Sequence, residues 1–537
     1  MLSPQSEKLF PALPGRLIDV ERLCLVSVTS RQRYAALSYV WGKEPSLMAL
    51  RQNIDRLQHP GALDIRPWAK PVAGDPIPVQ FPQTISHAIG LTRQLGIPLL
   101  WVDALCIVQD DDTERQHQLD RMGSIYANAY VTLVAAGGTA RSGLLGICGH
   151  TIPMPRVLKT PRYLTHKGRK NDSLHREIAK AHRRVTDSVW SQRGWTFQEQ
   201  IFSRRLLILD ATSVTWECHC AVWVEGLEPE EKECQNQGAV AAQGFAFSAE
   251  PNFGEYAWHV GQFNRRQLTY PEDVLDAFAG ILGVLSETAF REGFICGLPV
   301  RFFEAALLWY NKGELDKRQA KRQGSDNSVV MPPSWAWAAW GGAVEYDSSP
   351  QEDGDKTPMR WRYERPLVSW QYMAAGDKEW LPVTSISGRR LLSSDVDGIA
   401  ASTMAGEIRA HHTEGPVEEP TVSEPEATAA AKSSHLLLAY PLSASFEVQQ
   451  TFGKATVIVS NGSGGSAGSL VSLGQPVSNG DLCELVAVSI SSMNGEEAYD
   501  VLWVERESGV AYRRGVGRIR RAPWEAMKTE RIKLILG

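Results

Sequence analysis

The most regular pattern of apolar and polar residues runs from Leu99 to Ala136. A short apolar run rich in branched residues is followed by apolar residues at helical spacing and by a second apolar run, Tyr130 to Ala136. This order predicts a β-α-β unit in a parallel sheet that helices cover on both faces. Ligands bind beyond the carboxyl ends of the strands in such sheets, so the turn from Gln109 to Asp112 is a candidate binding position.

The same patterns predict the neighbouring elements of this sheet. Start and stop signals, such as Pro82 before a helix and Gly96 after it, mark several of their ends. The predicted elements are a strand at 34–42, a helix from Pro82 to Leu95, a strand at 99–108, one helix capped by Thr113 and Gln116 and reaching Ala129, and strands at 205–209 and 213–218.

Shifts in composition divide the chain into further regions. The segment 407–434 is rich in Pro, Glu, Ala and Thr, which is typical of a disordered linker. After it, short alternating runs separated by Gly and Asn predict a β-rich unit with a short helix near Trp524. The expected order is an arm at 1–33, an α/β domain at 34–220 with a basic insertion at 154–184, an acidic linker at 221–250, a helical region with a tryptophan-rich packing segment at 251–345, an irregular or β connection at 346–406, the disordered linker at 407–434 and the β-rich unit at 435–537.

The composition is that of a soluble globular protein. Of the 537 residues, 43% are hydrophobic and 22% are charged, and a net charge of -5 gives no overall attraction to nucleic acid or to an anionic membrane. The N-terminus lacks a basic segment followed by an apolar one, and no stretch reaches the roughly 18 apolar residues of a spanning helix. Eight scattered cysteines form no disulfide framework. We therefore expect a cytoplasmic protein without a membrane span and without a nucleic-acid partner.

Asp103 is an unusual carboxylate, because it interrupts an otherwise apolar run. An unpaired charge there would be costly, so Asp103 must find a partner. It is either a structural acid that accepts backbone or arginine hydrogen bonds, or a site acid whose pKa is tuned by burial.

Trp195 and Glu199 are the next candidate pair. They are four residues apart, so on a helix they share one face, and Arg193 precedes them. The structural alternative is a helix on which the tryptophan packs inward and the glutamate is solvated.

Other catalytic and metal-binding patterns lack support. Cys218, His219, Cys220 and Cys234 resemble zinc ligands, but on a strand His219 faces away from its two neighbours, and no second ligand pair has the usual spacing. Cys106 lies in an apolar run, where a cysteine is typically inert. The serine-hydrolase elbow and the H-E-x-x-H pair are absent, so we expect no metal.

Three segments together resemble the fungal heterokaryon-incompatibility (HET) domain. They are ALSYVWG at 36–42, LLWVDALCIVQDD at 99–111 with the downstream residues IYANA, and RGWTFQEQIFSRRLLIL at 193–209. Their order and spacing resemble the three successive blocks of that domain. The segments at 265–281 and 333–342, and the closing VLWVERESGVAYRRGVG, are similar to segments that accompany the domain.

The resemblance implies a role in fungal non-self recognition, in which the HET domain triggers regulated cell death. The domain has been likened to the Toll/interleukin-1-receptor (TIR) fold, a flavodoxin-like domain with a mostly parallel sheet. Some TIR domains cleave NAD with a glutamate in a W-x-x-x-E pattern, which Trp195 to Glu199 match.

A TIR-like site would use Glu199 and Asp103 as catalytic residues. The residues expected to contact the nucleotide are Trp41, Gly42, Gln109, Asp110, Arg193 and Trp195. NAD would be the substrate, no cofactor would be required, and the partner would be an incompatibility protein or a second copy of the chain. The alternative is a non-enzymatic assembly module in the same pathway. An enzyme requires Glu199 at a concave opening near Asp103, whereas an adaptor can bury it in an ion pair with Arg193 or expose it freely.

Overall fold

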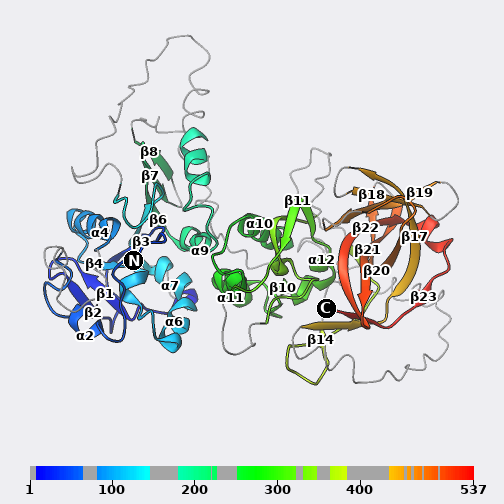
Figure 1. The fold of residues 1–537 in the computed structure, drawn as a ribbon, viewed down its shortest axis with the longest axis horizontal. Helices are drawn as coiled ribbons and strands as arrows, with labels where there is room; N and C mark the ends of the chain where they lie inside the picture. The colour runs from blue at the N-terminus through cyan, green and yellow to red at the C-terminus, as the bar shows by residue number, and fades with distance from the viewer. Residues whose placement is uncertain are drawn as a thin grey trace, which may run out of the picture. The chain divides into compact units, whose positions relative to one another are not determined.

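Figure 1 shows the computed structural model of the chain, and the structure describes residues 8–64, 81–144, 179–218, 221–225, 251–321, 330–346, 363–383, 435–452, 456–460, 465–473, 477–493 and 496–537. The chain divides into two compact units. The first comprises residues 1–252 and 262–291, and the second comprises residues 253–261 and 292–537. Most of the predicted basic insertion, most of the acidic linker and all of the predicted linker 407–434 lie outside the described residues.

An eight-stranded sheet forms the centre of the first unit, in the order β2-β1-β4-β3-β5-β6-β7-β8. The four central strands run parallel, which confirms the predicted parallel core. Numbered along the chain, they follow the order 2-1-3-4 found in flavodoxin-like sheets, with the switch point between β3 and β5. The strands are β1 (Arg16–Asp19), β2 (Cys24–Ser27), β3 (Tyr34–Ser38), β4 (Leu99–Trp101), β5 (Val131–Ala135), β6 (Arg205–Leu209), β7 (Val214–Cys218) and β8 (Ala221–Val224).

The expectation of a mostly parallel sheet is wrong for its outer strands. β1 and β2 join beside β4, and β7 and β8 join beside β6, in each case by antiparallel pairing. Both outer pairs are hairpins with short loops, and a short loop can connect only antiparallel neighbours. Moreover, β1 and β2 lie before residue 34, where the sequence pattern predicted no strand.

Helices connect the parallel strands (Figure 1). After the short α2 (Ile54–Leu57), helix α4 (Gln83–Gln94) leads from β3 to β4 and begins after Pro82, as predicted. Three helices separate β4 from β5, and α9 (Trp195–Phe202) leads into β6. Those three are α5 (Asp103–Cys106), α6 (Asp112–Leu119) and α7 (Met122–Asn128).

Between β4 and β5 the structure corrects three expectations. The strand predicted to reach Val108 ends at Trp101, and Asp103 starts a helix, where a carboxylate is favoured by the helix dipole. The predicted cap, Thr113 with Gln116, is wrong. Helix α6 is capped by Asp111, whose side chain accepts a hydrogen bond from the Glu114 N–H at 3.0 Å. The helix predicted to continue to Ala129 is two helices, α6 and α7.

The segment 262–291 packs against α9 within the first unit. It contains the end of α10 (Phe253–Asn264), the turn η1 (Pro271–Val274) and α11 (Asp276–Thr288), which confirms the predicted helical middle. The Phe197 ring of α9 stacks on Phe278 with centroids 6.3 Å apart and lies 5.8 Å from Phe263. This aromatic contact fixes the outer face of α9.

A closed six-stranded antiparallel barrel dominates the second unit (Figure 1). Its strands pair in the ring β17-β18-β19-β22-β21-β20, and β20 returns to β17. Buried side chains, including Phe446, Leu485 and Trp524, form its core. The barrel strands are β17 (Leu442–Phe452), β18 (Thr456–Ser460), β19 (Ser466–Ser472), β20 (Leu482–Met493), β21 (Glu496–Glu507) and β22 (Val510–Arg520).

The other elements of the second unit are short. Trp335 and Trp337 are fully buried, as the tryptophan-rich packing segment predicted. Among the helices that the structure describes, none is long and apolar enough to cross a membrane. The remaining elements are β9 (Phe294–Ile295), β10 (Leu298–Pro299), η2 (Val300–Phe302), α12 (Phe303–Leu307), β11 (Tyr310–Lys317), η3 (Trp337–Ala339), β12 (Trp340–Glu345), β13 (Tyr363–Pro366), β14 (Trp370–Met373), β15 (Leu381–Val383), β16 (Leu436–Ala439), α14 (Arg521–Glu525), β23 (Glu530–Arg531) and β24 (Leu534–Leu536).

Candidate active site

Asp103 lies just beyond the carboxyl end of β4, at the first position of α5. Its carboxylate accepts hydrogen bonds from the indole N–H of Trp41 at 2.7 Å and from the N–H of Ala104 at 2.7 Å. Burial raises the pKa of Asp103 to about 6, and these two donors oppose the increase because they stabilise the ionised form. The acid is therefore held in place and still titrates near neutral pH.

Glu199 lies in the middle of α9, is 7% exposed, and faces the end of β3. The hydroxyl of Ser38, the last residue of β3, donates to its carboxylate, and the Tyr126 hydroxyl lies close enough to lower the pKa of Glu199. Burial raises the pKa of Glu199 to about 7, the Ser38 hydrogen bond lowers it, and the negative charge of Asp103 raises it further. The two carboxylates are thus close enough to influence each other; we call them the acid pair.

Arg193 is the cation of this site. Its positive charge lowers the pKa of both Asp103 and Glu199, and its guanidinium donates to the Tyr39 carbonyl at 3.4 Å. Arg193 therefore acts on both buried carboxylates. A positive charge on a ligand would be stabilised beside these carboxylates.

Arg266, two residues after α10, contacts three residues of α9. It donates to Gln200 Oε1 at 2.8 Å and to Thr196 Oγ1 at 3.1 Å, and its guanidinium lies 4.7 Å from the centre of the Phe197 ring. Burial lowers the pKa of Arg266 to about 9, and the charge of Glu199 opposes this decrease. The segment after α10 therefore helps to orient the helix that carries Glu199.

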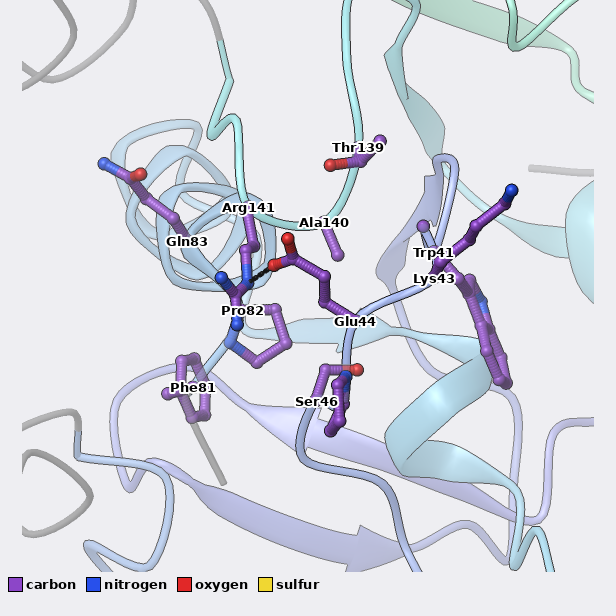
Figure 2. Close-up of a pocket in the computed structure, with 12 residues that line it drawn as sticks. Trp41, Lys43, Glu44, Ser46, Phe81, Pro82, Gln83, Thr139, Ala140 and Arg141 are labelled. Atoms are coloured by element: carbon purple, nitrogen blue, oxygen red, sulfur yellow. Dashed lines mark ion pairs between the residues drawn. The ribbon is translucent and has the colours of Figure 1, made fainter. Parts of the chain in front are cut away.

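A cavity of about 440 Å³ lies at the switch point between β3 and β5, and its lining residue Trp41 connects it to Asp103. Figure 2 shows Trp41 and Lys43 on one side of it, Phe81 and Gln83 on the other, and the ion pair of Glu44 and Arg141 between them. The complete lining is Trp41, Gly42, Lys43, Glu44, Pro45, Ser46, Phe81, Pro82, Gln83, Thr139, Ala140 and Arg141. Trp41 thus lines the cavity, and its indole N–H also donates to Asp103.

The predicted nucleotide-contacting residues fall into two groups. Trp41 and Gly42 line the cavity, and Gly42 adopts a φ of 87° at a position where a side chain would approach Thr139 to 3.3 Å. Gln109 and Asp110 instead stabilise local backbone: Gln109 donates to the Asp103 and Ile107 carbonyls, and Asp110 accepts from the Arg51 N–H.

Trp195 and Arg193 are absent from the cavity lining. Trp195 is half-buried at the first position of α9, one helical turn before Glu199.

No pattern in the sequence pointed to the residues that surround the Glu199 carboxylate. Ser38 lies 161 residues before Glu199 in the chain and also accepts a hydrogen bond from the Trp190 indole at 2.6 Å. Tyr126 donates to the Leu37 carbonyl at 3.1 Å. Ser38 lies within one of the resembling blocks, but its role is set by long-range packing, which no local pattern reports.

In the described part of the chain, no three His, Cys, Asp or Glu side chains are placed to hold a metal ion. Of the cysteine and histidine residues weighed as zinc ligands, His219, Cys220 and Cys234 lie outside the described residues.

Comparison with known families identifies the domain that contains this site. Residues 34–199 match the family model of the heterokaryon incompatibility protein (HET), so the chain carries a HET domain there. No curated protein and no solved structure matched the chain. The matched residues include both acids and the whole cavity lining, Trp41 and Arg141 among them.

Proposed function

Starting from the HET domain at residues 34–199, which implies a role in heterokaryon incompatibility, we propose that this domain is an effector of regulated cell death that cleaves NAD. One observation carries the proposal: Glu199 and Asp103 have raised pKa values and share Arg193, and Trp41 links Asp103 to the switch-point cavity. The strand order 2-1-3-4 and the Trp195–Glu199 spacing support a TIR-like site. An incompatibility partner protein or a second copy of the chain would increase the activity above the basal rate of the free chain.

The reaction needs few groups. The bond between the ribose carbon and the nicotinamide nitrogen breaks, nicotinamide leaves as a neutral molecule, and positive charge develops on the sugar. Water then adds to that carbon and loses a proton, which gives ADP-ribose. A carboxylate stabilises the positive charge and accepts the proton. Glu199, with a pKa of about 7, can do both near neutral pH.

The cavity offers complementary groups for the rest of the nucleotide. Trp41 and Phe81 provide flat apolar surfaces for a base, and Lys43 and Arg141 provide cations for phosphates. Arg141 is paired with Glu44, so a phosphate would take the place of that carboxylate. The proposal also requires an opening step, because Glu199 is 7% exposed and does not line the cavity. Displacing Trp41 would break its bond to Asp103 and join the cavity to the acid pair.

The burial of Glu199 favours a second candidate function, a non-enzymatic assembly module. In that case the hydrogen bond from Ser38 serves only to hold α9 against β3. The surface of the domain would then recruit partners in the same pathway.

Nicotinamide release from NAD by the purified full chain distinguishes the two candidates. We expect release by the natural protein, and at least about a hundredfold loss in Glu199→Gln and Asp103→Asn, because each removes a charge that stabilises the transition state. The matched control is Glu217→Gln, since Glu217 in β7 is equally buried and its pKa is also raised to about 7, outside the acid pair. No release by the natural protein, or equal release by Glu199→Gln, contradicts the enzymatic proposal.

A further inference from the structure

Four arginines and a tyrosine gather at the amino-terminal edge of the parallel strands. Arg33 directly precedes β3, Tyr130 directly precedes β5, and Arg204 and Arg205 stand at the start of β6. These three strands are neighbours and parallel, so their first residues meet at one edge of the sheet. Arg31, Arg33, Arg204, Arg205 and Tyr130 are called the arginine cluster below. The acid pair and the cavity lie at the other edge, beyond the carboxyl ends of the strands.

Tyr130 organises two of the guanidinium groups. Its ring, in a side chain that is 41% exposed, lies 4.0 Å from the Arg33 guanidinium carbon and 4.9 Å from that of Arg205. Arg205 also donates to the Tyr130 carbonyl at 3.2 Å. A cation held against an aromatic ring keeps a defined orientation while its N–H groups remain available at the edge of the plane.

Arg31, Arg33 and Arg205 bring three positive charges to this cluster. Arg31 donates to the Asn128 side chain at 2.8 Å and to the Phe10 carbonyl at 3.3 Å, both neutral acceptors. Throughout the described ranges, no carboxylate pairs with Arg31, Arg33 or Arg205. Burial lowers the pKa of Arg204, and the charges of Arg205 and Arg31 lower it further. The groups therefore repel one another, in a chain whose net charge is -5.

We propose that the arginine cluster binds a ligand with several closely spaced phosphate groups. A guanidinium group binds phosphate oxygens through two parallel N–H bonds, and each phosphate carries more charge than a carboxylate. Closely spaced phosphates therefore relieve the repulsion among these arginines with the fewest contacts. This site is separate from the acid pair, so a ligand there would regulate or localise the protein and would not take part in NAD cleavage.

Titration calorimetry of the full chain with tripolyphosphate tests the proposal. We expect binding by the natural protein that weakens roughly tenfold in Arg33→Gln and in Arg205→Gln, because each loses charge-assisted hydrogen bonds. Arg33→Lys keeps the charge and loses the planar fork, so its affinity should fall between those of the natural protein and Arg33→Gln. The matched control is Lys317→Gln, which removes a cation over another tyrosine ring, that of Tyr512, in the second unit. It should bind as the natural protein does.

Vesicles of phosphatidylcholine, with and without a phosphatidylinositol bisphosphate, separate the two sources of such phosphates. If the protein sediments with the bisphosphate vesicles and not with phosphatidylcholine vesicles, the ligand is a lipid headgroup. If the protein binds tripolyphosphate but sediments with neither kind of vesicle, the ligand is soluble. The proposal is overturned if neither probe binds, if Arg33→Gln binds as well as the natural protein, or if polyglutamate binds more tightly than tripolyphosphate. NAD cleavage is not a readout here, so failure of this proposal leaves the proposed function standing.

Discussion

Replacing Glu199 by Gln should change the pH dependence of stability in a calculable way. Glutamine keeps the shape of the side chain and still accepts a hydrogen bond from Ser38, but it cannot ionise. Burial raises the pKa of Glu199 from an ordinary value of 4.5 to about 7 in the folded protein. The folded state therefore holds the proton more tightly than the unfolded state. Its stabilising contribution is complete below pH 4.5 and is lost as the pH rises through about 7.

The size of this effect follows from the two pKa values. Their separation corresponds to about 3 kcal/mol of unfolding free energy at high pH, because each tenfold change in proton affinity is worth about 1.4 kcal/mol. About 1 kcal/mol of this loss falls between about pH 6 and about pH 8. Glu199→Gln also removes the negative charge that opposes ionisation of Asp103, so it flattens the pH dependence further.

Hydrogen exchange followed by mass spectrometry measures this effect locally in the full chain. Peptides from β3 and α9 report the opening of the site, and comparing the two proteins at the same pH cancels the intrinsic exchange rates. We expect the protection of Glu199→Gln relative to the natural protein to be roughly five- to tenfold greater at about pH 8 than at about pH 6. A ratio that is the same at both pH values refutes the buried, proton-binding state of Glu199.

Four further substitutions test other parts of the structure. Trp41→Phe removes the N–H donor of Asp103, so we expect the pKa of Asp103 to rise above about 6 in a carboxyl-carbon NMR titration; an unchanged pKa contradicts the bond. Asp500→Ala removes the acceptor of two serine hydroxyls and of the Arg518 guanidinium, which should cost about 3 kcal/mol in urea unfolding of the barrel. Gly517→Ala places a methyl group 2.1 Å from the Ser469 carbonyl oxygen, so the thermal unfolding midpoint should fall. Gly283→Ala in α11 places its methyl group where no atom lies within 4 Å, so the midpoint should rise.

The sequence predicted the elements whose patterns are local. Helix α4 and strands β5 and β6 lie where periodicity and start signals placed them. Asp103 shows the limit of such patterns, because a short apolar run is compatible with either a strand or a buried helical turn. The run after Trp101 contains that turn, and the acid begins a helix.

The environment of the candidate site could not be predicted from local sequence patterns. Trp41, Asp103, Arg193 and Glu199 were predicted to converge, and the structure brings their side chains into one cluster. The burial of Glu199 and its bond to Ser38 depend on the packing of α9 over the sheet. The closure of the barrel likewise depends on long-range pairing between β19 and β22.

Nicotinamide release by the full chain, followed across the pH range in which Glu199 titrates, decides whether the acid pair acts on NAD. We expect the rate to rise with pH through about 7, as Glu199 loses its proton, and to be lost in Glu199→Gln at every pH. A rate that does not change across this range, or that persists in Glu199→Gln, would show that these carboxylates serve the fold alone.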